Sequence, residues 1–184
     1  MRKMIYKVKQ WMRTRGFSLI ELLVAVGVLA VIGVVTVITL NPAELFKESR
    51  DTSRFSSLAT LRKAITLFQA NNSDPSAMGD QHVVYVSLPD EDPNCGSWGL
   101  GSFVDENGNT WQHQCAPSAD LTRANGSGWI PINFESEGKS LLPALPIDPV
   151  NQLDGSYFYT YARDEAGHYE INTRTESVKY SGGN

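Results

Sequence analysis

The sequence predicts an α+β protein in which a long N-terminal helix is joined to a small antiparallel β-sheet domain. Three observations predict this class. An apolar run of helical length follows a short basic segment, and an amphipathic segment follows the apolar run. The remaining residues form short β-branched and aromatic stretches separated by Gly, Pro and Asn. The 184 residues suffice for one domain and an anchor.

Residues 1–16 form a basic leader with six Lys or Arg residues and no Asp or Glu. The whole chain holds sixteen basic and twenty acidic residues, so removing the leader leaves a net charge of about −10 in place of −4. A leader this basic is expected to stay on the cytoplasmic side of a bilayer. The acidic remainder argues against nucleic acid as a partner, because phosphate binding needs clustered Lys and Arg. A net negative charge of this kind is typical of exported proteins with a soluble domain.

Residues 17–40 are expected to form a membrane-spanning helix. Leu22 to Leu40 contains no charge and can cross a hydrocarbon core of roughly 30 Å at about 1.5 Å per residue. Two features distinguish it from an ordinary secretory signal. The small residue Gly16 precedes the apolar run, where a signal peptide has its small residues after it. Glu21 lies just inside the apolar boundary, where a carboxylate needs a partner.

The junction Gly16-Phe17-Ser18-Leu19-Ile20-Glu21 resembles that of type IV pilins and type II secretion pseudopilins. The resemblance implies that a prepilin peptidase cuts between Gly16 and Phe17 and methylates the new amine of Phe17. It also implies that Glu21 serves filament assembly, and it gives the chain the lollipop shape of pilins. Glu21 could pair with the amine of its own chain or of a neighbouring subunit, and the resemblance favours the neighbour.

Residues 41–74 are expected to form the amphipathic second half of the helix, after a kink at Pro42. The predicted apolar stripe consists of Phe55, Leu58, Leu61, Ile65 and Phe68. Four charged residues are predicted to lie apart from it, with Lys47 and Asp51 as an i,i+4 pair: Lys47, Arg50, Asp51 and Arg54. A helix from residue 17 to residue 72 would be about 80 Å long, so its first half should protrude from a domain of this size.

Residues 75–184 are expected to form the β-rich domain. Strands are predicted at residues 83–86, 129–134, 156–161 and 168–172, the second at an edge because of Pro131. The last two should form a hairpin around residues 164–167. Tyr157, Tyr159 and Tyr161 share one face. That face is interpreted as packed against the sheet's core, although an aromatic stripe could also bind sugar or stack with a neighbour.

Cys95 and Cys115 lie on the predicted exported side, where disulfides persist, and are expected to be bonded. Closing a loop of about twenty residues would stabilise the domain by roughly 3 kcal/mol. Asn107-Gly108 predicts a hairpin turn inside this loop. A metal site here would need more ligands than His113 offers.

No cofactor is predicted. Calcium is the alternative, with Asp148, Asn151 and Asp154 as candidate ligands, although Asp-Pro and Asp-Gly turns explain the same segment. A second acidic segment, residues 105–109, departs from a calcium loop because its glycine comes too early. The sequence lacks the hydrolase, phosphate-loop and zinc-protease motifs, and its three histidines are scattered, so no enzymatic activity is predicted.

The sequence therefore predicts a structural subunit of a type IV pilus-like filament. The implied partners are other copies of the chain or homologous pilins, the prepilin peptidase, a pilus or secretion assembly platform, and the membrane. The chain would cross the cytoplasmic membrane once before assembly and then enter an extracellular or periplasmic filament. Two alternatives remain open: a type II secretion pseudopilin or minor pilin of a short periplasmic pseudopilus, and a membrane-tethered binding domain, for example for glycans.

Overall fold

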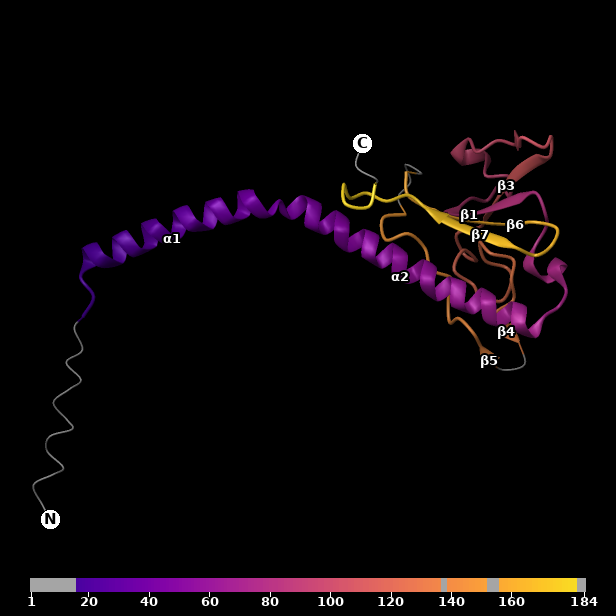
Figure 1. Ribbon diagram of the computed structural model, residues 1–184, viewed down its shortest axis with the longest axis horizontal. Helices are drawn as coiled ribbons and strands as arrows, with labels where there is room; N and C mark the ends of the chain where they lie inside the picture. Colours follow the sequence, from indigo (N-terminus) through magenta and orange to yellow (C-terminus); the bar gives the residue numbers. More distant parts are fainter. Residues whose placement is uncertain (1–15, 137–138, 152–155, 182–184) are drawn as a thin grey trace, which may run out of the picture. The chain divides into compact units, whose positions relative to one another are not determined.

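The structure, a computed structural model, describes residues 16–136, 139–151 and 156–181 (Figure 1). The chain divides into two compact units, Met1–Leu45 and Phe46–Asn184, and each is described by itself. The first contains a single apolar helix. The second contains most of a second helix and a small mixed sheet, so the α+β class predicted from the sequence is confirmed.

Helix α1 (Leu19–Leu40) is apolar along its whole length, with Glu21 in its first turn as its single charged residue. By length and composition it is able to cross a membrane, with a mean hydropathy of 2.8. Its polar hydroxyls bond within the helix: Thr36 donates to the carbonyl of Ile32 at 2.8 Å, and Thr39 to that of Val35 at 3.0 Å. The helix thus exposes few unsatisfied polar groups, as an apolar environment requires.

The helical path is interrupted at Asn41. This residue has φ of 42°, in the left-handed region, and helix α2 (Pro42–Asn71) starts immediately afterwards. Proline is well suited to a first helical position, because the N–H that it lacks would have no helical acceptor there. The predicted break at Pro42 coincides with this junction, and the predicted amphipathic half, residues 41–74, contains the whole of α2.

The sheet of the second unit has five strands in the order β2-β3-β1-β6-β7. Their bounds are β1 Val83–Pro89, β2 Phe103–Val104, β3 Thr110–Ala116, β6 Tyr159–Arg163 and β7 Tyr169–Thr173. The prediction of a purely antiparallel sheet is wrong, because β1 and β3 run parallel. The chain leaves β1, passes through β2 and turns back, so that β3 runs in the same direction as β1. Two short strands, β4 (Glu135–Ser136) and β5 (Lys139–Ser140), pair separately.

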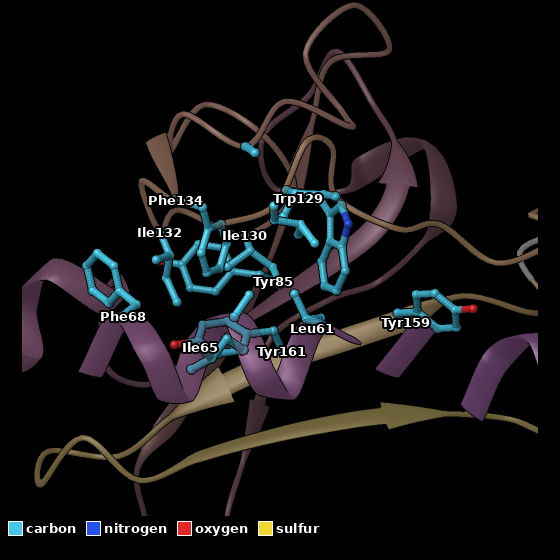
Figure 2. Close-up of a cluster of buried hydrophobic side chains, with 14 of the residues drawn as sticks. Leu61, Ile65, Phe68, Tyr85, Trp129, Ile130, Ile132, Phe134, Tyr159 and Tyr161 are labelled. Atoms are coloured by element: carbon cyan, nitrogen blue, oxygen red, sulfur yellow. The ribbon is translucent and has the colours of Figure 1, made fainter. Parts of the chain in front are cut away.

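Helix α2 covers one face of the sheet and forms the main core with it (Figure 2). Fully buried side chains of the helix, Leu61 and Ile65, meet those of β6, Tyr159 and Tyr161. The interpretation of the tyrosine stripe as a packed face is confirmed for these two tyrosines. Short one-turn helices lie at Pro75–Met78, just after α2, and at Gly96–Trp98.

The opposite face of the sheet carries a second, smaller cluster. Tyr85 of β1 belongs to the main core, whereas its neighbour Val86 packs with Leu88 and the two cysteines. This alternation follows from the two-residue period of a strand, which sends successive side chains to opposite faces. The disulfide segment therefore covers the face that α2 leaves open.

The prediction of a strand at residues 129–134 is wrong. The segment is an irregular loop whose apolar side chains are all buried: Trp129, Ile130, Ile132 and Phe134. Its backbone is held by single bonds to the preceding loop, such as Phe134 N–H to the carbonyl of Ala124 at 2.7 Å. The apolar run thus reflects burial in the core rather than strand pairing.

Both predicted hairpins are present. Strands β6 and β7 pair antiparallel across the predicted turn, where Gly167 has φ of 84°. Strands β2 and β3 pair across the Asn107-Gly108 turn, where Gly108 has φ of 85°. Glycine adopts this backbone region without the steric penalty of a side chain. Asp105 organises the second turn by accepting bonds from the backbone N–H groups of Asn107 and Asn109.

Candidate processing and assembly site

The predicted cleavage bond lies in an open, non-helical segment. Gly16, Phe17 and Ser18 precede α1 and are exposed, and the Phe17 residue retains 76% of its accessible surface. No neighbouring atom lies within 4 Å of where a Cβ on Gly16 would be. A peptidase could therefore reach this peptide bond without unfolding any described element.

Glu21 lies in the first turn of α1, at the positive end of the helix dipole. It forms no ion pair with another described residue. None of the 22 side chains of α1 is buried. A carboxylate among exposed apolar side chains must find a partner when lipid or other helices cover them, because an unpaired charge is strongly disfavoured there.

A model of the prokaryotic N-terminal methylation motif matches residues 11–37. The match spans the end of the leader, the Gly16–Phe17 junction, Glu21 and most of α1. The chain carries a prepilin-type methylation motif. The recognition of a type IV pilin or pseudopilin motif in the sequence is thereby confirmed. No curated protein and no solved structure shows significant similarity to the chain.

The prepilin motif supports a pilin-like or pseudopilin protein, which is a structural class of protein. Together with the apolar helix α1, it is consistent with a precursor anchored in a membrane. The motif covers residues 11–37, and the two cysteines and the calcium candidates belong to the second unit.

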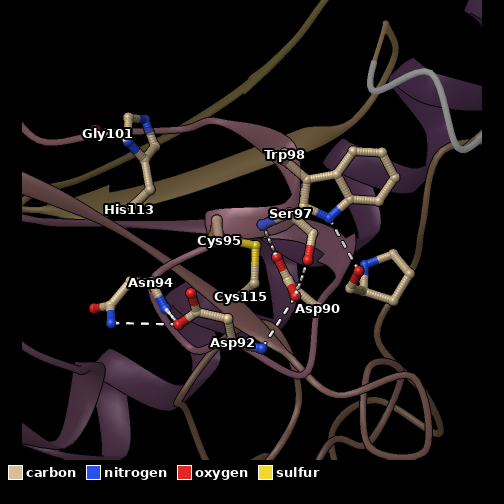
Figure 3. The surroundings of a disulfide bond; sticks show 10 residues. Asp90, Asp92, Asn94, Cys95, Ser97, Trp98, Gly101, His113 and Cys115 are labelled. Atoms are coloured by element: carbon tan, nitrogen blue, oxygen red, sulfur yellow. Dashed lines mark hydrogen bonds between the residues drawn. A yellow bond between two sulfur atoms is a disulfide. The ribbon is translucent and has the colours of Figure 1, made fainter.

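The two cysteines form a disulfide, as predicted, with a Cα–Cα distance of 5.3 Å (Figure 3). The Asp90 carboxylate anchors the chain beside it by accepting bonds from Asp92 N–H at 3.0 Å and from Ser97 N–H at 2.9 Å. These bonds, the one from Asp92 most of all, hold the pKa of Asp90 below its usual value against the effect of burial. The disulfide and these hydrogen bonds thus hold the segment in place against the face of the sheet opposite α2.

His113, which lies two residues before Cys115, contacts the carbonyl of Gly101 through Nδ1 at 2.7 Å. Among the residues that the structure describes, no three His, Cys, Asp or Glu side chains are grouped so that they could hold a metal ion.

The three calcium candidates, Asp148, Asn151 and Asp154, are not seen together around one site in the described structure. Asp148 is buried, and its carboxylate faces the guanidinium of Arg54 at 2.6 Å. The Asn151 backbone N–H donates to Asp148 at 3.3 Å, whereas Asp154 lies outside the described residues. A cation beside Arg54 would meet the positive charge of the guanidinium. Calcium binding stays an untested prediction, and the described contacts give Asp148 a different role.

That role is part of a group of charges, here called the Arg54 cluster, in which only the Arg50 side chain, 37% exposed, is not buried: Arg54, Asp51, Asp148, Glu176 and Arg50. The Arg54 side chain is fully buried, and its nitrogens lie 2.7 Å from Asp51, 2.6 Å from Asp148 and 2.6 Å from Glu176. Its guanidinium also lies 4.8 Å from the ring centre of Tyr157, close enough for a cation–π contact.

The Arg54 cluster joins three distant segments of the chain. Asp51 and Arg54 belong to α2, Asp148 to the loop before β6, and Glu176 to the C-terminal segment. The backbone also takes part, because Asp51 accepts bonds from Glu176 N–H at 3.0 Å and from Ser177 N–H at 2.8 Å. Further along, Tyr180 packs edge-on against Phe55 at 5.0 Å. The C-terminal segment is therefore bound along residues 48–55 of α2.

The pKa values of the cluster show that its charges stabilise one another. Burial acts to raise the pKa of Asp51, but hydrogen bonds from Ser177, the Glu176 backbone and Arg54 lower it to about 2. The hydrogen bond from Arg50 is the main cause that lowers the pKa of Glu176. Burial acts to lower the pKa of Arg54, and its bonds to the carboxylates, with Asp148 first, raise it instead. Asp51, Glu176 and Arg54 are therefore charged at neutral pH.

The prediction that Asp51 and Arg54 lie apart from the apolar stripe is wrong, and so is the extension of the stripe through Phe55. Phe55 is 42% exposed, while Asp51 and Arg54 are fully buried. The spacing of the two residues along the helix already indicates that they are buried. Residues 51, 54, 58, 61, 65 and 68 follow one another at intervals of three and four, so the two charged residues continue the buried stripe.

Proposed function

We propose that this protein is a structural subunit of a type IV pilus-like filament. Prepilin peptidase cleaves it between Gly16 and Phe17 and methylates the new amine of Phe17, and the mature chain polymerises through α1. The observation that carries the proposal is α1 itself. It has 22 residues, none of them buried, and one carboxylate in its first turn, within a matched prepilin motif.

The apolar surface of such a helix must be shielded from water both before and after assembly. Lipid covers it while the precursor spans the membrane, and other copies of α1 cover it after assembly. The exchange requires no large apolar driving force, because lipid tails and helix side chains are similarly apolar. Charge pairing then gives the assembled state its advantage: Glu21 of one copy neutralises the Phe17 amine of the next and sets the axial register between them.

The remaining parts of the proposal follow from this assignment. The partners are other copies or homologous pilins, the prepilin peptidase, the assembly platform and the membrane. The basic leader faces the cytoplasm before cleavage, and the second unit lies outside it, where the disulfide between Cys95 and Cys115 persists. The role is structural rather than enzymatic.

The intact mass of the mature protein tests the processing step. We expect a chain that starts at Phe17, one methyl group heavier and two hydrogens lighter than the reduced sequence from that residue. This single mass reports cleavage, methylation and the disulfide together. A chain that retains the leader, or one cut beyond Leu40, would refute the proposal.

A Glu21→Ala variant tests the assembly step. Cleavage at Gly16 should remain largely intact, whereas the yield of sedimentable assemblies should fall, because the neighbouring amine loses its buried partner. Glu44→Ala is the matched control, since it removes a first-turn acid from α2, outside the apolar span. Wild-type yields of assemblies from Glu21→Ala would refute the pairing mechanism.

A type II secretion pseudopilin or minor pilin is the second candidate. The observation that favours it is the Asp148-Pro149 turn before the aromatic strand β6, an arrangement similar to the corresponding segment of pseudopilins. Deletion of the gene distinguishes the two candidates. Loss of surface filaments would support the pilus subunit, and a secretion defect in cells that never show filaments would support the pseudopilin.

A further inference from the structure

Strand β7 forms an edge of the five-stranded sheet, because it stands last in the order β2-β3-β1-β6-β7. Its sequence, Tyr-Glu-Ile-Asn-Thr, contains no proline and one charged residue, and its pairing with β6 is continuous from Tyr159 and Thr173 to Arg163 and Tyr169. Proteins usually protect an edge with prolines, bulges, several charges or a covering segment. An edge without such protection can accept a further strand from another chain.

Two hydrogen bonds show which backbone groups of β7 face outward. Asp164 N–H donates to the carbonyl of His168 at 2.9 Å, so these residues form a bonded pair beside the turn. At the other end of β6, Tyr159 N–H points away from β7 and donates to Ser87 Oγ at 2.8 Å. Bonded and non-bonded pairs alternate in an antiparallel ladder, so every second residue of β7 turns its N–H and C=O groups away from β6. These residues are Tyr169, Ile171 and Thr173. Within the described part of the chain, no group bonds to their outward N–H and C=O groups.

A pocket lies beside this edge on each face of the sheet. On the face that α2 covers, Arg62 and residues 167–171 line a pocket of about 420 Å³. On the opposite face, Thr160 and Arg174 line a pocket of about 340 Å³. Thr160 belongs to that face because it pairs with Val86, which packs with the disulfide. Side chains of a strand alternate between faces, so those of an added strand would enter the two pockets in turn.

Each pocket contains an exposed arginine. Arg62 lies level with Tyr169, whose hydroxyl donates to the Arg62 carbonyl at 3.4 Å, and Arg174 directly follows the last residue of β7. Neither guanidinium forms an ion pair with another described residue. Glu170, the acid of β7, lies between them and accepts a bond from Asn172 at 3.0 Å. Charges further away are screened beyond about 8 Å, so the two arginines favour acidic side chains at the two ends of an added strand.

We propose that β7 binds an extended acidic segment of another protein as an additional strand of the sheet. The arginines define the pattern of that segment. Tyr169 and Arg174 are five residues apart, about 17 Å along a strand, and an odd separation puts their side chains on opposite faces. The segment should therefore carry acids at its first and sixth positions. An apolar side chain should lie opposite Ile171, which packs against the main core.

The chain itself does not offer a segment with this pattern. Glu165 and Glu170 are the only two acids in the sequence that are five residues apart, and both belong to the hairpin of β6 and β7. A second copy could therefore not supply the strand without unfolding its own sheet. The partner is thus a different protein, and the contact goes beyond the proposed filament function.

A labelled peptide tests the contact. The probe is fluorescein-Glu-Thr-Thr-Val-Thr-Glu-amide, which in antiparallel pairing places its first glutamate beside Arg174 and its valine opposite Ile171. Titration with the full chain in detergent micelles should give a saturable rise in fluorescence anisotropy. N-methylation of the valine removes a backbone donor to β7 and should weaken binding at least fivefold. N-methylation of the fifth residue, whose N–H points away from β7, is the matched control and should leave binding unchanged.

Charge reversal tests the two acidic positions. Arg62→Glu and Arg174→Glu should each lower the affinity about two- to fivefold, the range of a surface ion pair. A peptide with lysine in place of the glutamate that faces the changed residue should restore it. Lys63→Glu, an exposed neighbour of Arg62 on α2, is the control and should leave the affinity unchanged. Absence of binding, equal binding of both N-methylated peptides, or reversal without recovery would overturn the proposal.

Amide hydrogen exchange locates the bound peptide. The outward amides of Ile171 and Thr173 should exchange more slowly when the peptide is added, whereas those of Glu170 and Asn172, which already bond to β6, should change little. Protection of the outward amides that rises with protein concentration, without any peptide, would assign the edge to a second copy and overturn the proposal. The processing and assembly tests are separate measurements, so either proposal can fail without the other.

Discussion

Replacing Arg54 by Met tests whether the Arg54 cluster stabilises the second unit. Methionine keeps much of the volume of the arginine stem, so the substitution removes a charge while leaving little cavity. The side chain is fully buried, and it contacts three carboxylates at 2.6 to 2.7 Å. The change therefore leaves negative charges in a dry environment without their shared partner.

The three carboxylates keep different numbers of hydrogen-bonding partners when the guanidinium is removed. Asp51 keeps its bonds from the Glu176 and Ser177 amides, and Glu176 keeps Arg50. Among the donors that the structure describes, Asp148 keeps the backbone N–H groups of its own turn. Breaking a buried ion pair by removing one partner costs about 3 to 5 kcal/mol. For a unit of this size we expect the midpoint of thermal unfolding to fall by roughly 10 °C.

Urea unfolding of the mature chain in detergent micelles, followed by tryptophan fluorescence, measures the change. The midpoint should fall while the denaturant dependence stays constant, because the fold is unchanged. Arg123→Met is the control: Arg123 pairs with Asp120 at 2.9 Å, but its side chain is 57% exposed, so its loss should cost about 1 kcal/mol or less. Asp148→Asn should recover part of the loss in the Arg54→Met background. Equal, small losses for Arg54→Met and Arg123→Met would refute the reasoning.

Three further predictions concern the second unit. The low pKa of Asp51 means that the unfolded chain binds its proton more readily than the folded one, so the stability that this group adds is complete above about pH 5. About 2.5 kcal/mol should be lost as the pH falls from about 5 to about 1, and Asp51→Asn should flatten this part of an acid titration followed by circular dichroism. Replacing Cys95 and Cys115 by Ser should lower the free energy of unfolding by roughly 3 kcal/mol, and thiol labelling of both native cysteines without reductant would contradict the bond. Ile65→Ala should destabilise by about 2 to 5 kcal/mol, and Leu67→Ala, exposed on the other side of α2, by about 0.5 kcal/mol or less, as measured by the same urea unfolding.

The elements that could be predicted from the sequence are those with a strong local signal. The apolar run of α1 and the junction at Gly16 are set by composition alone, and the two hairpins are marked by Asn-Gly and Ala-Gly turns. The disulfide pairing required no choice, since the chain has two cysteines. In each case the information lies within a short stretch of residues.

The errors arose where distant segments decide the structure. A run such as Trp129 to Phe134 is apolar both in a strand and in a buried loop, and only its surroundings distinguish the two. The parallel pairing of β1 and β3 depends on the path of a long connection. The charge of Arg54 predicts an exposed side chain, whereas its spacing along the helix places it in the buried stripe. The partners that make this burial possible lie 94 and 122 positions further along the chain.

Because the Arg54 cluster continues the buried stripe, it affects the axial position in which α2 packs on the sheet. Apolar contacts are non-directional, so Leu61, Ile65 and Phe68 alone would tolerate a shift of the helix by one turn, about 5.4 Å. The same shift would carry Arg54 away from Asp148 and Glu176, so Asp148 would lose its buried guanidinium partner and Arg54 would keep one of its three carboxylates, that of Asp51 on the same helix. Because that arrangement is far more costly than a repacked apolar contact, the charged end of the stripe fixes the register that the apolar end leaves free.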